Sequence, residues 1–197
     1  MTRLDVVVEV VPKRAFASAL GWPGWCRSGK DEEGALEALA TCRDRYAVVA
    51  TEAGLLLPED LELHVVERAA GTTTTTFGAP DVRSAHEAGP VPDDELALLA
   101  ASWRVLDRVV GAAPATLRKG PRGGGRDRDA VLAHVTEAQH SYARKAGVRL
   151  TPAERADTER ARRELLAALR SGEGDRYWVR RATWHVLDHV WEIEDKS

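Results

Sequence analysis

The chain has 197 residues, of which 44% are hydrophobic, and its formal net charge is −3 with a sequence pI of about 6.1. This length can bury one good core or two small ones. The near-neutral charge gives no reason to expect a nucleic-acid partner. No segment has the long apolar run that a membrane span or a signal peptide needs, so we expect a cytoplasmic protein without a membrane partner. Cys26 and Cys42 lack the spacing of a metal-binding pair and are expected to be reduced structural thiols.

The first third of the chain is predicted to form a small ββαβ domain over residues 1–70. A β-branched run in residues 4–11 and a second extended segment in residues 14–20 predict a β-hairpin. Residues 30–54 carry apolar side chains at helical spacing, and residues 61–67 alternate in the manner of a third strand.

Residues 71–92 are predicted to connect two domains. They contain five consecutive threonines, three glycines and three prolines, a composition that favours extended or irregular backbone over helix. Within this linker, residues 72–77 are a candidate edge strand.

The rest of the chain, residues 93–197, is predicted to be helical. Apolar residues recur at helical spacing in four segments, which are residues 93–110, 127–145, 152–169 and 175–194. Pro92-Asp93 and Thr151-Pro152 are typical helix starts. An up-and-down four-helix bundle is the natural packing, and together with the first domain it predicts an α+β fold.

Three histidines form a candidate metal site. His185 and His189 are four residues apart and therefore share one helix face, about 6 Å apart along its axis. His134 lies on the second predicted helix, close enough in chain length to lie on a neighbouring helix of the bundle. Three neutral imidazoles suit zinc or another borderline divalent metal and leave a coordination position open. The alternative is a set of core histidines hydrogen-bonded to one another. Surface or packing roles are expected for His64, His86 and His140.

Two glutamates are candidate catalytic residues. Glu192 follows His189 by three residues and Glu137 follows His134 by three, so both lie near the predicted ligands. Their carboxylates could orient the imidazoles or move protons. The alternative is that each is a surface carboxylate paired with an arginine.

A basic, glycine-rich segment at residues 117–128 precedes the helix that carries His134. Arg118, Arg122 and Arg126 are candidate ligands for an anionic substrate or cofactor. The segment lacks both the Walker motif and the dinucleotide-binding glycine pattern. A solvated connection between helices is the alternative.

Residues 93–197 resemble the DinB-like superfamily of four-helix bundles. The resemblance rests on the Val-Leu-Ala-His-Val-Thr-Glu-Ala run around His134 and on the His-x-x-x-His pattern of His185 and His189. It implies that these three histidines bind zinc, nickel or a similar ion. It also implies an activity like that of metal-dependent thiol transferases or isomerases, which use a low-molecular-weight thiol.

Residues 1–70 resemble the HicB-like fold. The pattern of that fold includes a Leu-Pro-Gly-Cys turn, which appears here as Leu-Gly-Trp-Pro-Gly-Trp-Cys ending at Cys26, and a helix rich in glutamate and alanine. Trp25 separates Pro-Gly from the cysteine, and no helix-turn-helix or ribbon-helix-helix motif follows. The resemblance therefore implies the fold without the antitoxin role.

Two functions follow as hypotheses. The first is a metal-dependent thiol transferase or hydrolase that acts on a small molecule, with zinc or nickel and a low-molecular-weight thiol as cofactors. The second is a non-catalytic module that forms a homodimer and binds a ligand or protein, with any metal structural or vestigial.

Overall fold

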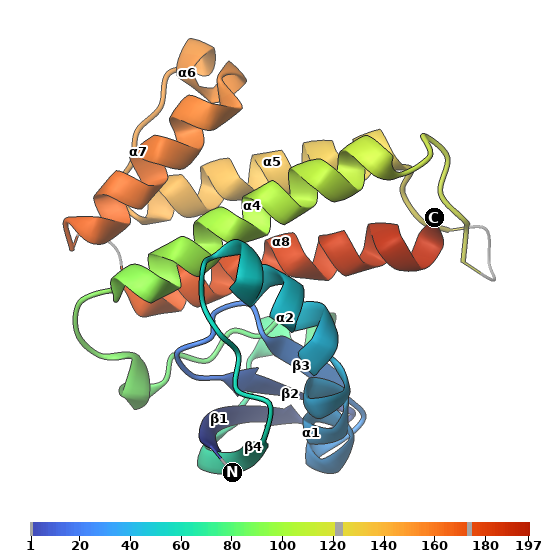
Figure 1. The fold of residues 1–197 in the computed structure, drawn as a ribbon, viewed down its shortest axis with the longest axis vertical. Helices are drawn as coiled ribbons and strands as arrows, with labels where there is room; N and C mark the ends of the chain where they lie inside the picture. Colours follow the sequence, from blue (N-terminus) through green and yellow to red (C-terminus); the bar gives the residue numbers. More distant parts are fainter. Residues whose placement is uncertain (1, 121–123, 173–174) are drawn as a thin grey trace.

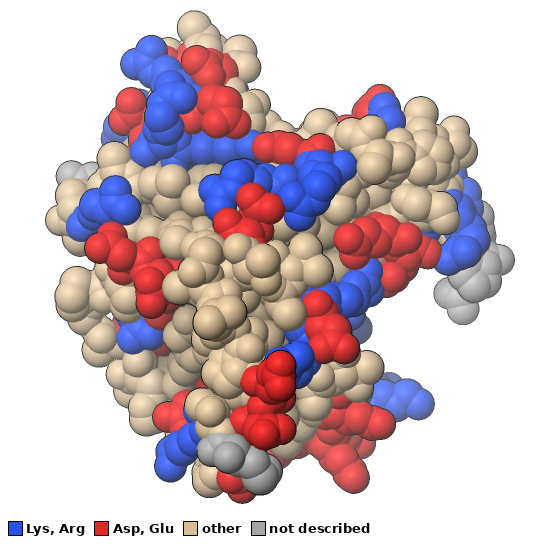
Figure 2. Space-filling view, in the orientation of Figure 1, with Lys and Arg blue, Asp and Glu red and all other residues tan. Residues whose placement is uncertain are grey.

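The computed structural model describes residues 2–120, 124–172 and 175–197, and it has the predicted α+β class. A four-stranded mixed sheet lies beside a group of long helices (Figure 1). Acidic and basic side chains are interspersed over the face seen in Figure 2, in keeping with the small net charge. Among the described residues, no helix is long and apolar enough to cross a membrane.

The sheet contains the predicted hairpin and one strand that was not predicted. Strands β1 (Thr2–Val11) and β2 (Arg14–Ala19) pair antiparallel, with Val6 opposite Ala19. Strand β4 (Leu61–Ala70) pairs parallel with β1, and the order is β3-β2-β1-β4. The unpredicted strand is β3 (Cys26–Gly29), whose Cys-Arg-Ser-Gly sequence has little strand propensity and is extended because it pairs with β2.

The helix predicted over residues 30–54 is two helices. Helix α1 (Glu32–Thr41) begins at Asp31, whose carboxylate accepts a hydrogen bond from Gly34 N at 2.9 Å. Helix α2 (Arg43–Glu52) begins after Cys42, which lies at the joint. The start of α1 lies so close to β3 that a Cβ at Gly29 would be 2.2 Å from the backbone nitrogen of Ala35. Glycine is therefore required where strand and helix meet.

The expected edge strand at residues 72–77 is wrong, and the segment 71–92 is irregular only outside two short helical stretches. Residues Thr73–Phe77 form a short helix, α3, and Ala85–Glu87 form a 3₁₀ turn, η1. The threonines act as helix caps, because Thr72 accepts from Thr74 N and Thr75 Oγ1 accepts from Thr72 N at 2.9 Å. This local bonding outweighs the β-propensity of threonine.

Residues 71–92 are also held against the sheet through Glu9, a buried residue of β1. Its carboxylate accepts hydrogen bonds from the backbone nitrogens of Asp81 and Val82, the latter at 2.7 Å, and from Thr75 Oγ1 at 3.2 Å. Burial raises the pKa of Glu9, while these hydrogen bonds act in the opposite direction. The segment is thus fixed by specific polar contacts.

Four long helices pack beside the sheet: α4 (Asp93–Ala112), α5 (Arg128–Lys145), α7 (Thr158–Arg170) and α8 (Arg176–Lys196). Helices α4 and α5 both lie along α8, and α7 contacts α4 and α5 (Figure 1). The helix predicted over residues 152–169 is interrupted. A short helix, α6 (Pro152–Ala156), ends at Asp157, whose side chain then caps α7 by accepting from Arg160 N at 3.0 Å.

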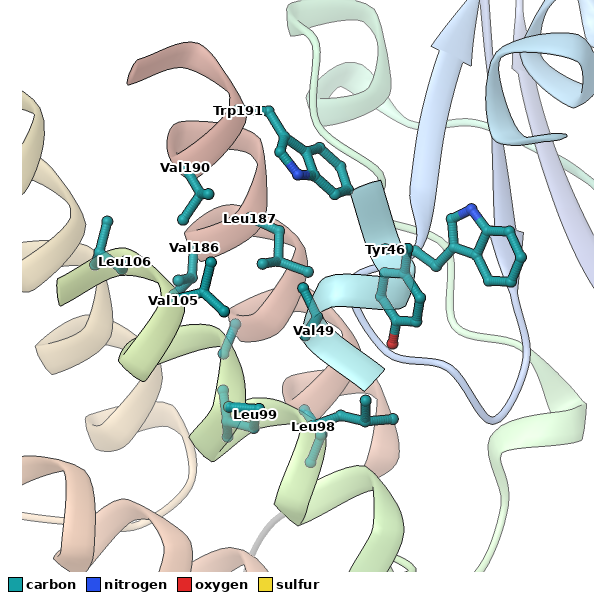
Figure 3. Close-up of a cluster of buried hydrophobic side chains, with 14 of the residues drawn as sticks. Tyr46, Val49, Leu98, Leu99, Val105, Leu106, Val186, Leu187, Val190 and Trp191 are labelled. Atoms are coloured by element: carbon teal, nitrogen blue, oxygen red, sulfur yellow. The ribbon is translucent and has the colours of Figure 1, made fainter. Parts of the chain in front are cut away.

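Helix α8 is buried between the sheet part and the other long helices. Figure 3 shows Val186, Leu187 and Val190 of α8 among side chains from α4 and α2. On the sheet side, Trp25 stacks on Tyr46 with ring centroids 5.1 Å apart. One hydrophobic cluster therefore joins residues from both halves of the chain and fixes the position of the helix that carries two of the three candidate ligands.

Candidate metal centre

Helices α5 and α8 bring the three predicted histidines together. His185 and His189 lie one turn apart on α8, and His134 approaches them from α5. The ring centroid of His134 lies 5.0 Å from that of His185 and 4.9 Å from that of His189. The ring centroids of His185 and His189 are 4.7 Å apart. The three imidazoles thus form a nearly equilateral triangle, and the predicted convergence is confirmed.

One pair of ring nitrogens has the spacing of two ligands on a single divalent ion. One nitrogen from each imidazole lies within 4.8 Å of the other two. The Nε2 atoms of His134 and His185 are 3.2 Å apart. Two nitrogens bound to one tetrahedral zinc ion at its usual bond length lie about 3.3 Å apart. A hydrogen bond between two imidazoles also explains this single distance, but it does not explain why the ring centroid of His189 lies 4.9 Å from that of His134 and 4.7 Å from that of His185.

Glu192 orients one of the three imidazoles. Its Oε2 atom lies 2.6 Å from Nδ1 of His189, and its Oε1 atom accepts from Nζ of Lys196 at 2.5 Å. With Nδ1 engaged, the Nε2 lone pair of His189 is left for a ligand. Burial opposes ionisation of Glu192, but the hydrogen bonds from Lys196 and His189 outweigh it and lower its pKa. A carboxylate behind a ligating histidine is a common feature of metal sites.

The electrostatics of the site favour neutral imidazoles. Burial, followed by the positive charge of a protonated His189 or His134, lowers the pKa of His185 from 6.5 to about 3. Burial also lowers the pKa of His134, with smaller contributions from His189 and Arg126. A neutral imidazole is the form that binds a metal.

We expect the metal-free protein to lose stability on acidification because of His185. Its pKa in the folded protein is about 3 and its ordinary value is 6.5, so between these values the unfolded chain binds more protons. The contribution of His185 to the free energy of unfolding is therefore complete above pH 6.5. Below that pH it falls by about 1.4 kcal/mol per pH unit until the folded-state pKa is reached. Urea unfolding at a series of pH values should show this slope, and His185→Gln should reduce it. His64→Gln, on β4 and outside the cluster of three histidines, should not; equal slopes in all three proteins would contradict the prediction.

Aromatic side chains that were not predicted as site residues lie beside His185. The rings of Tyr142 and Trp184 lie 6.0 and 6.2 Å from its imidazole, and burial raises the pKa of Tyr142. Nδ1 of His185 is buried and has no hydrogen-bond partner among the described residues. Tyr142 lies eight residues after His134 on α5, a helical spacing that could have placed it on the same face.

The second predicted catalytic residue, Glu137, is placed elsewhere. Its side chain is 82% exposed, and its Oε2 atom lies 3.9 Å from Nδ1 of His140. Glu137 follows His134 by three residues, but its carboxylate makes no contact with the triangle of imidazoles, whereas the same spacing on α8 allows Glu192 to contact His189. Among the carboxylates of the described residues, only that of Glu192 forms a hydrogen bond or ion pair with His134, His185 or His189.

The predicted basic segment lies near the end of α8 that carries Glu192. The guanidinium of Arg118 donates to the backbone carbonyl of Asp195. The backbone nitrogen of Arg118 donates to the backbone carbonyl of Lys196 at 2.8 Å. Arg126 is exposed and close enough to lower the pKa of both His134 and His185. Arg122 lies outside the described residues. The structure thus places Arg126 near the histidines, while Arg118 anchors the segment to α8.

Both cysteines are free and buried, and neither belongs to the cluster of three histidines. Burial raises the pKa of Cys26 to about 12, and it also raises the pKa of Cys42. Neither thiol is therefore a reactive thiolate near neutral pH.

Comparisons with protein-family models, with curated proteins and with solved structures each found no match to this chain. The function therefore rests on the geometry of the site itself.

Proposed function

We propose that the protein is a metal-dependent enzyme that acts on a small molecule, as a thiol transferase or a hydrolase. The observation that carries this proposal is the triangle of His134, His185 and His189, with Glu192 bonded to the outer nitrogen of His189. Three histidine ligands leave one tetrahedral position for water or substrate, which is the arrangement of catalytic zinc sites.

Zinc and nickel are the ions that suit a site made only of imidazoles. Such an ion, when bound, lowers the pKa of a thiol or water and makes it a nucleophile near neutral pH. A low-molecular-weight thiol is the cosubstrate that we propose on the DinB-like resemblance of residues 93–197. The HicB-like resemblance of residues 1–70 contributes a proposed fold and no activity.

The chain's own residues have separable roles in this proposal. His134, His185 and His189 hold the ion, and Glu192 fixes the tautomer of His189 and holds a proton at its Nδ1. Lys196 keeps Glu192 ionised. Arg126 adds positive charge beside the site, which suits an anionic substrate or thiol.

The activity is tested by a screen of low-molecular-weight thiols against electrophilic acceptors, with and without zinc, nickel or manganese. We expect turnover that requires metal and is lost in His189→Ala, because that substitution removes a ligand and the partner of Glu192. His64→Ala, on β4 with a side chain 43% exposed, is the matched control and should retain activity.

Two outcomes of this screen would count against the mechanism. Turnover that survives both metal removal and His189→Ala would exclude it. Metal binding without turnover for any pair of substrates would favour the other hypothesis, a dimeric binding module in which the metal is structural.

A further inference from the structure

A second polar cavity lies between the C-terminal half of α5 and the short helix α6. Its volume is about 250 Å³, and none of the three histidines of the metal centre lines it. Three arginines, Arg144, Arg149 and Arg155, line it together with Ser141. Two aliphatic residues of the connection between the helices, Val148 and Leu150, complete an apolar part of the wall.

The three arginines of this cavity lack the carboxylate partners that nearby arginines have. Arg160 is paired with Glu154 at 2.6 Å, and Arg162 with Asp107 at 2.6 Å. Among residues 2–120, 124–172 and 175–197, no carboxylate lies within ion-pair distance of Arg144, Arg149 or Arg155. Arg155 uses its Nε to donate to the carbonyl of Leu150 at 3.2 Å, which holds the turn and leaves the rest of its guanidinium unused.

One acidic residue also lines the cavity. Glu137 lies 3.9 Å from Nδ1 of His140, and its side chain is 82% exposed whereas that of His140 is 13% exposed. The lining thus carries three guanidinium groups against one carboxylate. The balance of charge inside the cavity is positive.

We propose that this cavity binds a small organic anion with two or more oxyanion groups, such as a dicarboxylate or a phosphate ester of a short carbon chain. Guanidinium groups bind carboxylate and phosphate through paired hydrogen bonds, and the hydroxyl of Ser141 adds one donor. The aliphatic wall of Val148 and Leu150 contacts the carbon chain. A volume near the lower limit of known ligand pockets, about 300 Å³, restricts the ligand to a few heavy atoms.

This proposal does not rest on the metal centre. The cavity and the triangle of histidines share helix α5, but they share no lining residue. Binding of an anion here is therefore measurable in metal-free protein, and its failure would leave the proposed enzyme function untested and intact. The basic segment at Arg118 and Arg126, where an anion site was predicted from the sequence, is a different part of the molecule.

The test is to titrate the full-length, metal-free protein with succinate and with glycerol phosphate. Calorimetry measures the binding, and the shift in the thermal unfolding temperature is a second readout. Sodium chloride at the same ionic strength is the reference. We expect saturable binding of at least one probe. The double variant Arg144→Gln with Arg149→Gln should weaken it by about tenfold or more for each guanidinium removed. These two arginines are exposed and make no described side-chain hydrogen bond, so the fold should persist.

The matched control is Arg163→Gln, an exposed arginine of α7 outside the cavity, which should bind as the unaltered protein does. Tighter binding of succinate identifies a dicarboxylate site, and tighter binding of glycerol phosphate identifies a phosphate site. The proposal is overturned if neither probe binds beyond the chloride reference. It is also overturned if the double variant binds undiminished, or if Arg163→Gln weakens binding as much as the double variant does.

Discussion

Replacing His185 by alanine is expected to abolish stoichiometric binding of zinc or nickel. His185 lies close to both other imidazoles: its Nε2 is 3.2 Å from that of His134, and its ring centroid is 4.7 Å from that of His189. Losing the carboxylate behind a ligating histidine costs about 10–100-fold in metal affinity. Loss of a ligand itself should exceed the upper end of that range. Competition titration with a coloured chelator measures the affinity.

A graded series separates ligands from orienting residues. Glu192→Gln keeps all three imidazoles and should weaken metal binding by about 10–100-fold. His140→Ala is the matched control, since His140 also lies on α5 but contacts Glu137 and not the triangle of imidazoles. Equal affinity in His185→Ala and the unaltered protein would show that the imidazoles form a hydrogen-bonded cluster. Equal losses in His140→Ala and His185→Ala would point to general destabilisation.

The second large effect is expected at a buried ion pair that fixes residues 71–92 to α8. Nε of Arg180 lies 2.6 Å from Oε1 of Glu87, and the two side chains are only 5% and 7% exposed. Arg180 also donates to the carbonyl of Val82 at 2.5 Å. Removing one member of such a pair leaves an uncompensated buried charge, which costs about 3–5 kcal/mol. We expect Glu87→Ala to lower the free energy of unfolding by this amount.

An exposed ion pair provides the control for this prediction. Arg170 and Asp93 lie 3.3 Å apart with side chains 66% and 84% exposed. Pairs of this kind contribute about 0–1 kcal/mol, so Arg170→Ala should change stability little. Urea unfolding of the three proteins under one set of conditions measures both effects. A loss in Glu87→Ala no larger than that in Arg170→Ala would contradict the assignment of Glu87 as an anchor.

The elements with strong periodicity were predictable from the sequence, and those fixed by local bonding or pairing were not. The β-branched run of β1 and the helical spacing in α4, α5 and α8 reflect burial of their apolar side chains, which the sequence records directly. Strand β3 exists because it pairs with β2, a contact between segments that a local pattern does not contain. The helix at Thr73–Phe77 arises from hydrogen bonds of threonine side chains, which compete with their β-propensity.

The cluster of three histidines was predictable for a physical reason that the arginine-lined cavity does not share. Residues four apart on one helix share a face, so the spacing of His185 and His189 predicts from the sequence that their side chains lie together. Glu192 lies one turn further along the same helix. The arginine-lined cavity depends on how the chain turns between α5 and α6, which brings Arg149 and Arg155 beside Arg144. Such a turn is set by packing and leaves no periodic signal.

The central claim is that His134, His185 and His189 hold one divalent ion, and elemental analysis tests it most directly. The protein is to be purified without an affinity tag and without chelators, because a histidine tag would itself bind metal. We predict close to one zinc or nickel ion per chain, retained through gel filtration. A chain that carries no ion after purification, and takes up none when zinc or nickel is added, would contradict the claim.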